Sequence, residues 1–315
     1  MPERAVSLAW VESPLQLLNA VEFAAASGEP VHVVPRDAGP QMHSTAEELR
    51  RRGLPAGVAI GDPVAGIPWD LLRRHRTWVL GDALSGQARL ALARLWPAGV
   101  VLLDDGTMTL HLATAVAGSL PLQRPSKPEA LRMRVLGRVA KSALRRARPT
   151  LFSYYGSSRP ELRAFRRSGE VRTNLFDWSR STAPGVRVPA GRILLGTARV
   201  VDGLMSADDH SRWVADQAQD GPVIYLPHRR ERPEDLRRVS AIGGVAVQLT
   251  GIPVELALAG TTEPLDVVSL PSSAVDTLQR VLEGTGSTVR LVDVPGLDRL
   301  EQREQRDRRA VGVVR

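Results

Sequence analysis

Short apolar runs alternate with longer amphipathic stretches along the first half of the chain. Such runs, bounded by Gly, Pro or Asp, are typical of strands buried on both faces in a parallel sheet. The strands predicted in this way cover residues 5–11, 31–34, 76–80 and 100–103. Helices are predicted over 15–26, with Pro14 in the first turn, and over 44–52, where Ser44 and Glu47 have the spacing of a capping box. The pattern therefore predicts an α/β domain.

The second half repeats this alternation after a stretch rich in Pro and Gly at 181–191, which we interpret as a linker. Strands are predicted over 192–195, 223–226, 245–249, 265–270 and 289–292, and helices over 207–219, 233–242, 254–259 and 274–284. We expect an N-terminal Rossmann-like domain at 1–183, a C-terminal one at 190–300 and a charged tail at 301–315. Two such α/β domains would face a central cleft, with the carboxyl ends of their strands aimed at it.

The composition excludes several classes of protein. The 315 residues include no cysteine, which rules out disulfides, Cys-ligated zinc and thiol nucleophiles. No run of about 18 apolar residues is present, and the first residues lack the apolar core of a signal peptide, so we expect a cytoplasmic protein. The net charge of +8 predicts attraction to a polyanion or to an anionic membrane surface. Nucleic acid is not expected as the partner, because no nucleic-acid-binding motif is found.

The segment 127–148 has the pattern of a basic amphipathic helix. Its cations are Lys127, Arg132, Arg134, Arg138, Lys141, Arg145, Arg146 and Arg148, and its apolar residues include Leu131, Val135, Leu136, Val139 and Leu144. Such a helix could lie on anionic lipid at the inner face of a membrane, or line a groove for an acidic chain. The alternative is the solvated face of an ordinary packed helix.

The fingerprints of nucleotide cofactors are not found. A dinucleotide-binding domain needs G-x-G-x-x-G after its first strand. Here that position has Glu12-Ser13-Pro14-Leu15-Gln16, and the second domain opens with Leu195-Gly196-Thr197. There is no P-loop, and the histidines show no metal-ligand spacing. We therefore expect neither a cofactor nor a metal.

Two adjacent carboxylates follow the apolar run 100–103, as Asp104-Asp105-Gly106. Alternation along a strand sends successive side chains to opposite faces, so one carboxylate would point into the cleft. Partly desolvated there, it could accept the proton of an attacking hydroxyl. The alternative is that Asp105 or Thr107 caps the helix that follows.

Polar groups also follow two strands of the second domain. His228 comes after such a strand and precedes Arg229 and a second arginine, a combination that suits a phosphate group. Ser272 and Ser273 begin a helix, where hydroxyls and free backbone amides can seat a phosphate. The alternatives are a basic surface turn and an ordinary serine N-cap.

In this order, the motifs resemble those of the bacterial sialyltransferases and polysialyltransferases with a GT-B fold. These families share an acidic pair followed by Gly, a His-Pro and a Ser-Ser, which correspond here to Asp104-Asp105-Gly106, His228 and Ser272-Ser273. The opening Ser13-Pro14-Leu15-Gln16-Leu17-Leu18-Asn19 is also similar to the start of the polysialyltransferase-like and lipooligosaccharide sialyltransferase families. One departure is that His228 is followed by Arg229 and preceded by the proline.

The resemblance implies an inverting, metal-independent GT-B glycosyltransferase that moves a sialic acid or related nonulosonic acid from a CMP-activated donor to a glycan hydroxyl. Asp104 would be the general base, and His228 would stabilise or protonate the departing CMP phosphate. The donor side would comprise Gly196, Thr197, His228, Arg229, Glu255, Ser272 and Ser273. The acceptor or donor-sugar side would comprise Ser13, Gln16, Asn19, Asp105 and Gly106. Whether Asp104 or Asp105 is the base stays open, as does the identity of the glycan acceptor, polyanionic or lipid-linked.

Two other functions fit the same pattern. One is a non-catalytic protein that keeps the GT-B shell and binds an acidic glycan or a membrane, although a binder has no need of the acid, the His and the Ser-Ser together. The other is a GT-B transferase that uses another nucleotide sugar, such as a UDP- or GDP-sugar. Such enzymes commonly hold the diphosphate with a longer basic and Gly-rich set, which is not evident in this sequence.

Overall fold

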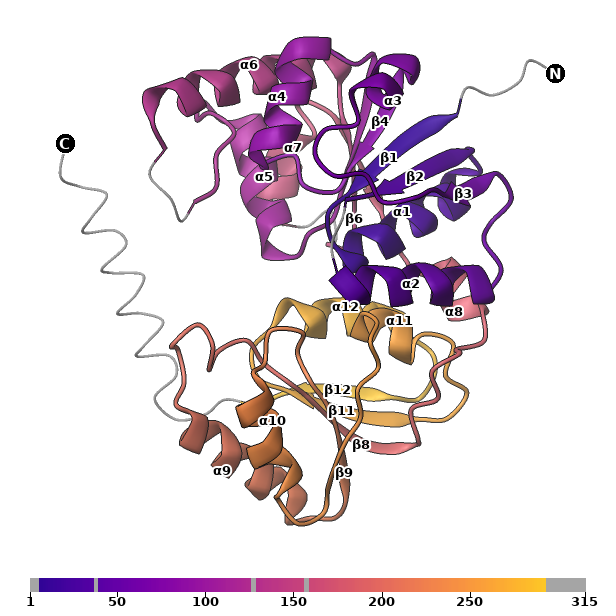
Figure 1. Cartoon of the computed structure of the whole chain (residues 1–315), viewed down its shortest axis with the longest axis vertical. Helices are drawn as coiled ribbons and strands as arrows, with labels where there is room; N and C mark the ends of the chain where they lie inside the picture. The colour runs from indigo at the N-terminus through magenta and orange to yellow at the C-terminus, as the bar shows by residue number, and fades with distance from the viewer. Residues whose placement is uncertain (1–5, 37–38, 126–128, 156–158, 293–315) are drawn as a thin grey trace. The chain divides into compact units, whose positions relative to one another are not determined.

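Two compact units divide the chain (Figure 1). The first contains Met1–Val186 and Gly251–Gly260, and the second contains Arg187–Thr250 and Thr261–Arg315. The computed structural model describes residues 6–36, 39–125, 129–155 and 159–292. The expected charged tail at 301–315 and Lys127 lie outside these described residues.

The first unit is built on a seven-stranded parallel sheet with the order β3-β2-β1-β4-β5-β6-β7. Its strands are β1 (Ser7–Val11), β2 (Val31–Pro35), β3 (Val58–Ile60), β4 (Thr77–Leu80), β5 (Gly99–Leu103), β6 (Thr150–Ser153) and β7 (Glu170–Thr173). Its helices are α1 (Pro14–Ser27), α2 (Gly39–Arg51), α3 (Trp69–Arg74), α4 (Gly86–Leu95), α5 (Thr107–Ala117), α6 (Leu131–Ala147), α7 (Pro160–Phe165), α8 (Asp177–Ser181) and α11 (Val254–Leu258). Every residue of β1 is buried, as expected of a central strand covered on both faces.

The four strands predicted in this half are all present, but the sequence pattern missed β3, β6 and β7. β3 and β7 are edge strands without a fully buried residue, so their composition carries little apolar signal. The capping box at Ser44 is wrong. α2 begins at Gly39, five residues earlier, which places Ser44 inside the helix.

The segment 251–260 groups with the first unit, although the boundaries expected from the sequence put it in the second domain. Arg52, whose side chain is fully buried, donates hydrogen bonds to the carbonyls of Leu256 at 2.5 Å and Ala259 at 3.2 Å. It also pairs with Glu48 at 2.7 Å. These bonds satisfy carbonyls at the end of α11 and leave no buried charge unpaired, which ties α11 to α2.

The second unit is a five-stranded parallel sheet with the order β10-β9-β8-β11-β12. Its strands are β8 (Gly191–Leu195), β9 (Val223–Leu226), β10 (Val245–Val247), β11 (Leu265–Ser269) and β12 (Thr288–Leu291). Its helices are α9 (Ala207–Ala218), α10 (Pro233–Ser240) and α12 (Ser273–Val281). In both sheets the chain winds outward from a central strand and then reverses, between β1 and β4 and between β8 and β11. In sheets of this kind, ligands bind beyond the carboxyl ends of the strands at the reversal.

Candidate functional site

Asp104 lies directly after β5, at the carboxyl edge of the first sheet. Its side chain is fully buried. Oδ1 accepts a hydrogen bond from the Gly106 amide at 2.8 Å, and Oδ2 accepts one from the hydroxyl of Ser153, the last residue of the neighbouring β6. Burial raises the pKa of Asp104 to about 7, even though the bonds from Ser153, Gly106 and Thr109 act to lower it. The Asp104 carboxyl is therefore partly protonated near pH 7, and its hydrogen bonds hold the turn after β5.

Asp105 is the more accessible member of the acidic pair, since it is half-buried. Its amide donates to the Thr109 hydroxyl at 2.7 Å. Gly106 has φ +65° and ψ −138°, a conformation that favours glycine, and it occupies the N-cap position of α5 without a side-chain cap. Neither Asp105 nor Thr107 is therefore the N-cap of this helix.

Of the residues expected on the acceptor side, Asn19 contacts this turn, and both Asn19 and Gln16 are buried within the unit. Asn19 is buried and donates to the Asp104 carbonyl at 3.0 Å, while its own oxygen accepts from Asn174 Nδ2 at 3.1 Å. Gln16 is also buried and accepts from the Glu12 amide at 2.8 Å. Ser13 caps α1 through the Gln16 amide. Asn19 thus joins the turn after β5 to Asn174 after β7, while Gln16 stabilises the turn before α1.

His228 lies after β9, at the carboxyl edge of the second sheet, and is half-buried. Its Nδ1 accepts a hydrogen bond from the Arg230 amide at 3.2 Å, which places the proton of the neutral ring on Nε2. Burial, followed by the charges of Arg229 and Arg230, lowers the pKa of His228 to about 4. At neutral pH the ring is therefore uncharged, with an Nε2–H group that can donate.

The half-buried Glu231, which belongs to none of the sequence motifs, holds the loop of His228 in place. Its Oε1 accepts from the His228 amide at 2.8 Å, and its Oε2 accepts from the Tyr225 hydroxyl at 2.8 Å. Burial raises the pKa of Glu231 to about 7, and an opposing hydrogen bond comes from the Thr197 amide. Glu231 therefore joins the loop after β9 to the loop after β8.

Gly196 is the residue that makes room for this junction. A Cβ added at Gly196 would lie 2.0 Å from Glu231 Oε1 and 2.4 Å from the His228 amide nitrogen. The resemblance places Gly196 and Thr197 on the donor side. The structure shows that the space is filled by the side chain and backbone of the same unit, and Thr197 beside it is buried.

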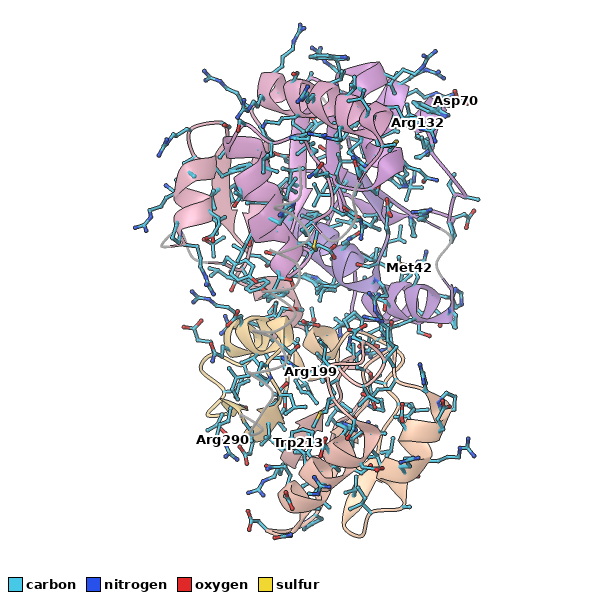
Figure 2. All side chains as sticks on the ribbon, turned by 90° about the vertical axis from the view of Figure 1, so that its left-hand side faces the viewer. Met42, Asp70, Arg132, Arg199, Trp213 and Arg290 are labelled. Atoms are coloured by element: carbon cyan, nitrogen blue, oxygen red, sulfur yellow. The ribbon has the colours of Figure 1, made fainter. Side chains whose placement is uncertain are left out.

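Arg199 joins the loop after β8 to the loop after β11. It donates to the Pro271 carbonyl at 3.1 Å, next to Ser272 (Arg199 is labelled in Figure 2). Ser272 is exposed and is the N-cap of α12, where its hydroxyl accepts from the Ala274 amide at 3.2 Å. Ser273 is half-buried and is the first residue of this helix. Since β9, β8 and β11 are neighbours in the sheet, the structure brings His228, Arg229, Thr197 and the serine pair to one edge.

Glu255 does not share that edge in the second unit. It lies in α11, which packs in the first unit, and its side chain is buried. The resemblance implies that Glu255 belongs to the donor side, and the expected boundaries place it in the C-terminal domain. The hydrogen bonds from Arg52 to α11 explain why the fold assigns this segment differently.

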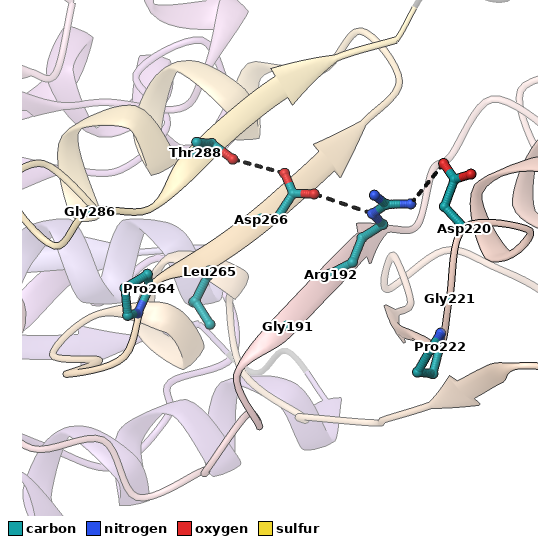
Figure 3. A pocket seen from close by; sticks show the side chains of 10 residues that line it. All are labelled: Gly191, Arg192, Asp220, Gly221, Pro222, Pro264, Leu265, Asp266, Gly286 and Thr288. Atoms are coloured by element: carbon teal, nitrogen blue, oxygen red, sulfur yellow. Dashed lines mark hydrogen bonds and ion pairs between the residues drawn. The ribbon is translucent and has the colours of Figure 1, made fainter.

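A pocket of about 430 Å³ lies at the opposite, amino edge of the second sheet (Figure 3). It is lined by the first residues of β8, β11 and β12 and contains none of the residues predicted for the site. Inside it, Asp266 forms an ion pair with Arg192 at 3.2 Å and accepts a hydrogen bond from the Thr288 hydroxyl at 2.8 Å (Figure 3). Arg290 also forms an ion pair with Asp266. The hydrogen bond from Arg290 is the main reason that the pKa of Asp266 is lowered to about 2. These charges neutralise one another, so the pocket is not the candidate site.

Within the described residues, no cluster of three or more His, Asp or Glu side chains is placed to hold a metal ion. A helix that could cross the hydrocarbon core of a membrane is likewise not found there.

Comparisons with known proteins give the class of this fold. The sequence matches no protein-family model, and a search of curated proteins also finds no match. Among solved structures, a UDP-glucosyltransferase from Polygonum tinctorium superposes with a TM-score of 0.51 at 12% identity, covering 95% of this chain and 82% of that chain. The heptosyltransferase WaaC of E. coli gives a TM-score of 0.47 at 12% identity, covering 96% and 99%. The GT-B domain of a sialyltransferase from Photobacterium damselae gives 0.44 at 10%, covering 92% of each.

At these identities the likeness is one of fold. The chain has the parallel α/β architecture of the GT-B glycosyltransferases, with sheets of seven and five strands, and the predicted fold class is confirmed.

Proposed function

We propose that the chain is an inverting glycosyltransferase that transfers a nonulosonic acid from a CMP-activated donor to a glycan hydroxyl. The observation that carries this proposal is the carboxyl edge of the second unit. There, neighbouring strands end in a neutral His228 with an Nε2–H donor, in Arg229 and in the Ser272-capped N-terminus of α12. Donors of this kind favour a phosphate. The small number of them suits the single phosphate of CMP better than the diphosphate of other nucleotide sugars.

In the proposed reaction, the acceptor oxygen forms a bond to the anomeric carbon while the bond between that carbon and the CMP phosphate oxygen breaks. The acceptor proton goes to a carboxylate of the first unit, and the electron pair of the broken bond leaves with CMP. Negative charge therefore grows on the phosphate in the transition state. A hydrogen-bond donor fixed beside it stabilises that charge without reorganisation.

The state of His228 favours one of the two roles that the resemblance implies. With its pKa lowered to about 4, the free ring carries no second proton to give at neutral pH. Its Nε2–H group can still donate a hydrogen bond to the phosphate. We therefore propose that His228 stabilises the departing CMP and does not protonate it.

Burial separates the two members of the acidic pair. A general base must come within hydrogen-bond reach of the hydroxyl that it deprotonates. Asp104, the base implied by the resemblance, has no exposed surface and already accepts from Gly106 and Ser153. Asp105 is half-buried and meets this condition more readily. We propose that the pair supplies the base. Asp105 contacts the acceptor hydroxyl, and Asp104 positions Asp105.

The test measures CMP release from CMP-sialic acid together with nucleotide binding. Asp105→Asn should slow transfer by about 10²–10⁴-fold and leave CMP affinity unchanged, because general-base catalysis has that magnitude. His228→Ala should slow transfer by about 10²–10³-fold and also weaken CMP binding. The opposite result would identify Asp104 as the base: Asp104→Asn folds but loses transfer to the same extent, and Asp105→Asn keeps it.

A non-catalytic binding protein is the second candidate, and the complete burial of Asp104 is the observation that favours it. Thermal stabilisation by CMP, UMP, ADP and GMP separates the possibilities. A nucleotide at about a hundred times its dissociation constant adds roughly 2.7 kcal/mol to the free energy of unfolding. Selective stabilisation by CMP supports the proposal. Selective stabilisation by another nucleotide overturns the CMP donor, and nucleotide binding without turnover of any donor supports a binding protein.

A further inference from the structure

One face of α6 exposes apolar side chains to solvent. The exposed fractions are 72% for Leu131, 48% for Val135 and 37% for Val139. Because these residues are spaced by four, they lie on the same side of the helix. The residues that α6 buries, among them Ala140 and Leu144, lie on the other side, which packs in the first unit. Leu131, Val135 and Val139 therefore form an apolar stripe that is separate from the packed face of the helix.

Close backbone packing fixes which side of α6 faces outward. A Cβ at Gly137 would lie 2.3 Å from the Leu122 carbonyl oxygen, so only glycine allows the helix to approach this loop. Lys141 donates to the carbonyls of Gly118 and Leu120, both at 2.6 Å. Arg145 donates to the last carbonyls of α5. These two cations of the segment 127–148 stabilise the end of α5 and are not available to a partner.

The remaining arginines of α6 lie beside the apolar stripe. Arg132, Arg134, Arg138 and Arg146 are all exposed, and none of them has an ion-pair or hydrogen-bond partner for its side chain among the described residues. Figure 2 shows Arg132 at an end of the first unit from which nitrogen-tipped side chains project outward. The outward face of α6 thus combines unpaired positive charge with apolar surface.

Other exposed apolar residues of the first unit lie on α4 and in the loops after α4 and α5. Of the ten large hydrophobic residues that are exposed within the described part of the chain, Leu131, Val135 and Val139 lie on α6. Leu90 lies on α4, which packs against α6, and Trp96 and Leu120 lie in the loops that follow α4 and α5. An enrichment of this kind marks an interaction surface, whereas apolar residues exposed singly need no explanation.

We propose that the outward face of α6 docks on an anionic phospholipid surface, with Leu131, Val135 and Val139 entering the headgroup region. Apolar side chains beside several arginines on one exposed helix face are the combination that binds in the plane of an anionic bilayer. A polyanion such as a nucleic acid or an acidic glycan would use the arginines but gain nothing from the apolar stripe. The combination therefore favours lipid, and the inference does not depend on the proposed transferase activity.

Flotation of the full chain with lipid vesicles tests this inference. We expect binding to phosphatidylcholine vesicles that contain phosphatidylglycerol and little binding to phosphatidylcholine alone. Leu131→Ser, Val135→Ser and Val139→Ser combined should lower the vesicle partition coefficient by about 100-fold or more, because each side chain loses its apolar transfer energy. Arg134→Gln with Arg138→Gln should lower it by about 25-fold, or about fivefold for each arginine near an anionic surface.

Matched controls come from the second unit. Arg232→Gln with Arg237→Gln changes the net charge equally at two exposed positions, the N-cap of α10 and a residue within it. Leu249→Ser removes a side chain that is 74% exposed. Both controls should bind vesicles like the unaltered chain. All substitutions are at exposed positions, and circular dichroism confirms that each variant is folded.

Two results would overturn the inference. One is a failure of the unaltered chain to float with phosphatidylglycerol vesicles. The other is a loss of binding in the arginine variant with full binding in the triple serine variant, which identifies charge attraction alone and a polyanion as the partner. CMP stabilisation, measured in parallel on the same variants, stays unchanged if the two proposals are separate.

Discussion

The carboxyl edges of the two sheets both carry acidic and hydroxyl side chains, but they use them differently. At the edge of the first unit, the Asp104 carboxyl is fully buried and satisfied by Gly106 and Ser153. At the edge of the second unit, the supporting carboxyl is the half-buried Glu231, three positions after His228. The motif residues His228 and Ser272 there are half-buried and exposed.

This difference shows what a sequence motif can report. In the second unit, His228, Arg229 and Ser272 are accessible, whereas Thr197 is buried. The carboxyl of Glu231, which supports the His228 loop, belongs to none of the sequence motifs. In the first unit, Asp104 is fully buried, and its carboxyl holds the turn after β5. A raised pKa near 7 occurs at both Asp104 and Glu231 for the same reason, desolvation. Such a pKa identifies buried carboxyls of either kind and does not by itself mark a catalyst.

The largest expected effect concerns the pH dependence of stability in the first unit. Because the folded-state pKa of Asp104 is about 7 and its ordinary value is 3.8, its contribution to stability is fully present below pH 3.8 and is lost as the pH rises through 7. The loss amounts to about 4 kcal/mol for this group. Asp104→Asn should therefore flatten the decrease between pH 4 and 7, measured by hydrogen exchange of β5 and β6 amides.

Asp266→Asn is the matched control for this measurement. The pKa of Asp266 is lowered to about 2, so its contribution is present above pH 3.8 and is lost only as the pH falls toward 2. Its removal should leave the range from pH 4 to 7 unchanged. A decrease that is as steep in Asp104→Asn as in the unaltered chain would show that Asp104 is solvated in the folded protein.

The second prediction concerns the junction of the loops after β8 and β9. In Gly196→Ala, the new methyl group would meet Glu231 Oε1 and the His228 amide, and the backbone cannot move away cheaply. We expect the free energy of unfolding of the second unit to fall by about 3 kcal/mol, measured by hydrogen exchange of β8 and β9. Gly243→Ala, where nothing lies within 4 Å of the added Cβ, should change it by less than about 0.5 kcal/mol. Equal stabilities would mean that Glu231 leaves this position readily.

The fold could be predicted from the sequence because buried parallel strands have continuous apolar runs. β1, β5, β8 and β11 follow that rule, whereas the edge strand β7 (Glu-Val-Arg-Thr) does not and was missed. Missing β6 in turn concealed Ser153, the partner of Asp104. The assignment of α11 to the first unit depends on Arg52, about 200 residues away in sequence, and no local pattern reports such a contact.

The adjacency of His228 and Glu231 in sequence was the one signal available for the supporting carboxyl. Two arginines separate them, and in the run His-Arg-Arg-Glu the cations are the residues that suit a phosphate. A glutamate after a strand is usually solvated. That this one accepts from the His228 and Thr197 amides is evident only from the folded structure. The role of a residue that acts through the backbone of another cannot be deduced from residue type.

Glu231 provides the third prediction, with an effect on binding. Removing the carboxyl in Glu231→Ala leaves the buried His228 amide without its acceptor, so the loop should loosen and the CMP dissociation constant should rise about tenfold. Glu231→Gln keeps an acceptor oxygen and should bind CMP nearly as well as the unaltered chain. Glu234→Ala, at an exposed position of α10, is the control. If Glu231→Gln is as weak as Glu231→Ala, then the charge of the carboxylate is needed and positioning is an insufficient account.

The smallest effect is expected at Ser272, which is both accessible and structural. Its hydroxyl already accepts from the Ala274 amide as the N-cap of α12, although the side chain is exposed. Ser272→Ala should destabilise the first turn of α12 by about 1 kcal/mol, which hydrogen exchange of its amides would report as roughly fivefold faster opening. Ser240→Ala, at the end of α10, is the control and should leave the exchange of α12 unchanged. If Ser272→Ala also weakens CMP binding while Ser272→Asp, which retains a cap but adds a negative charge, weakens it further, Ser272 both caps the helix and faces the phosphate. If Ser272→Ala changes only the exchange rates, the serine is an N-cap alone, and the phosphate donors of this edge are His228 and Arg229.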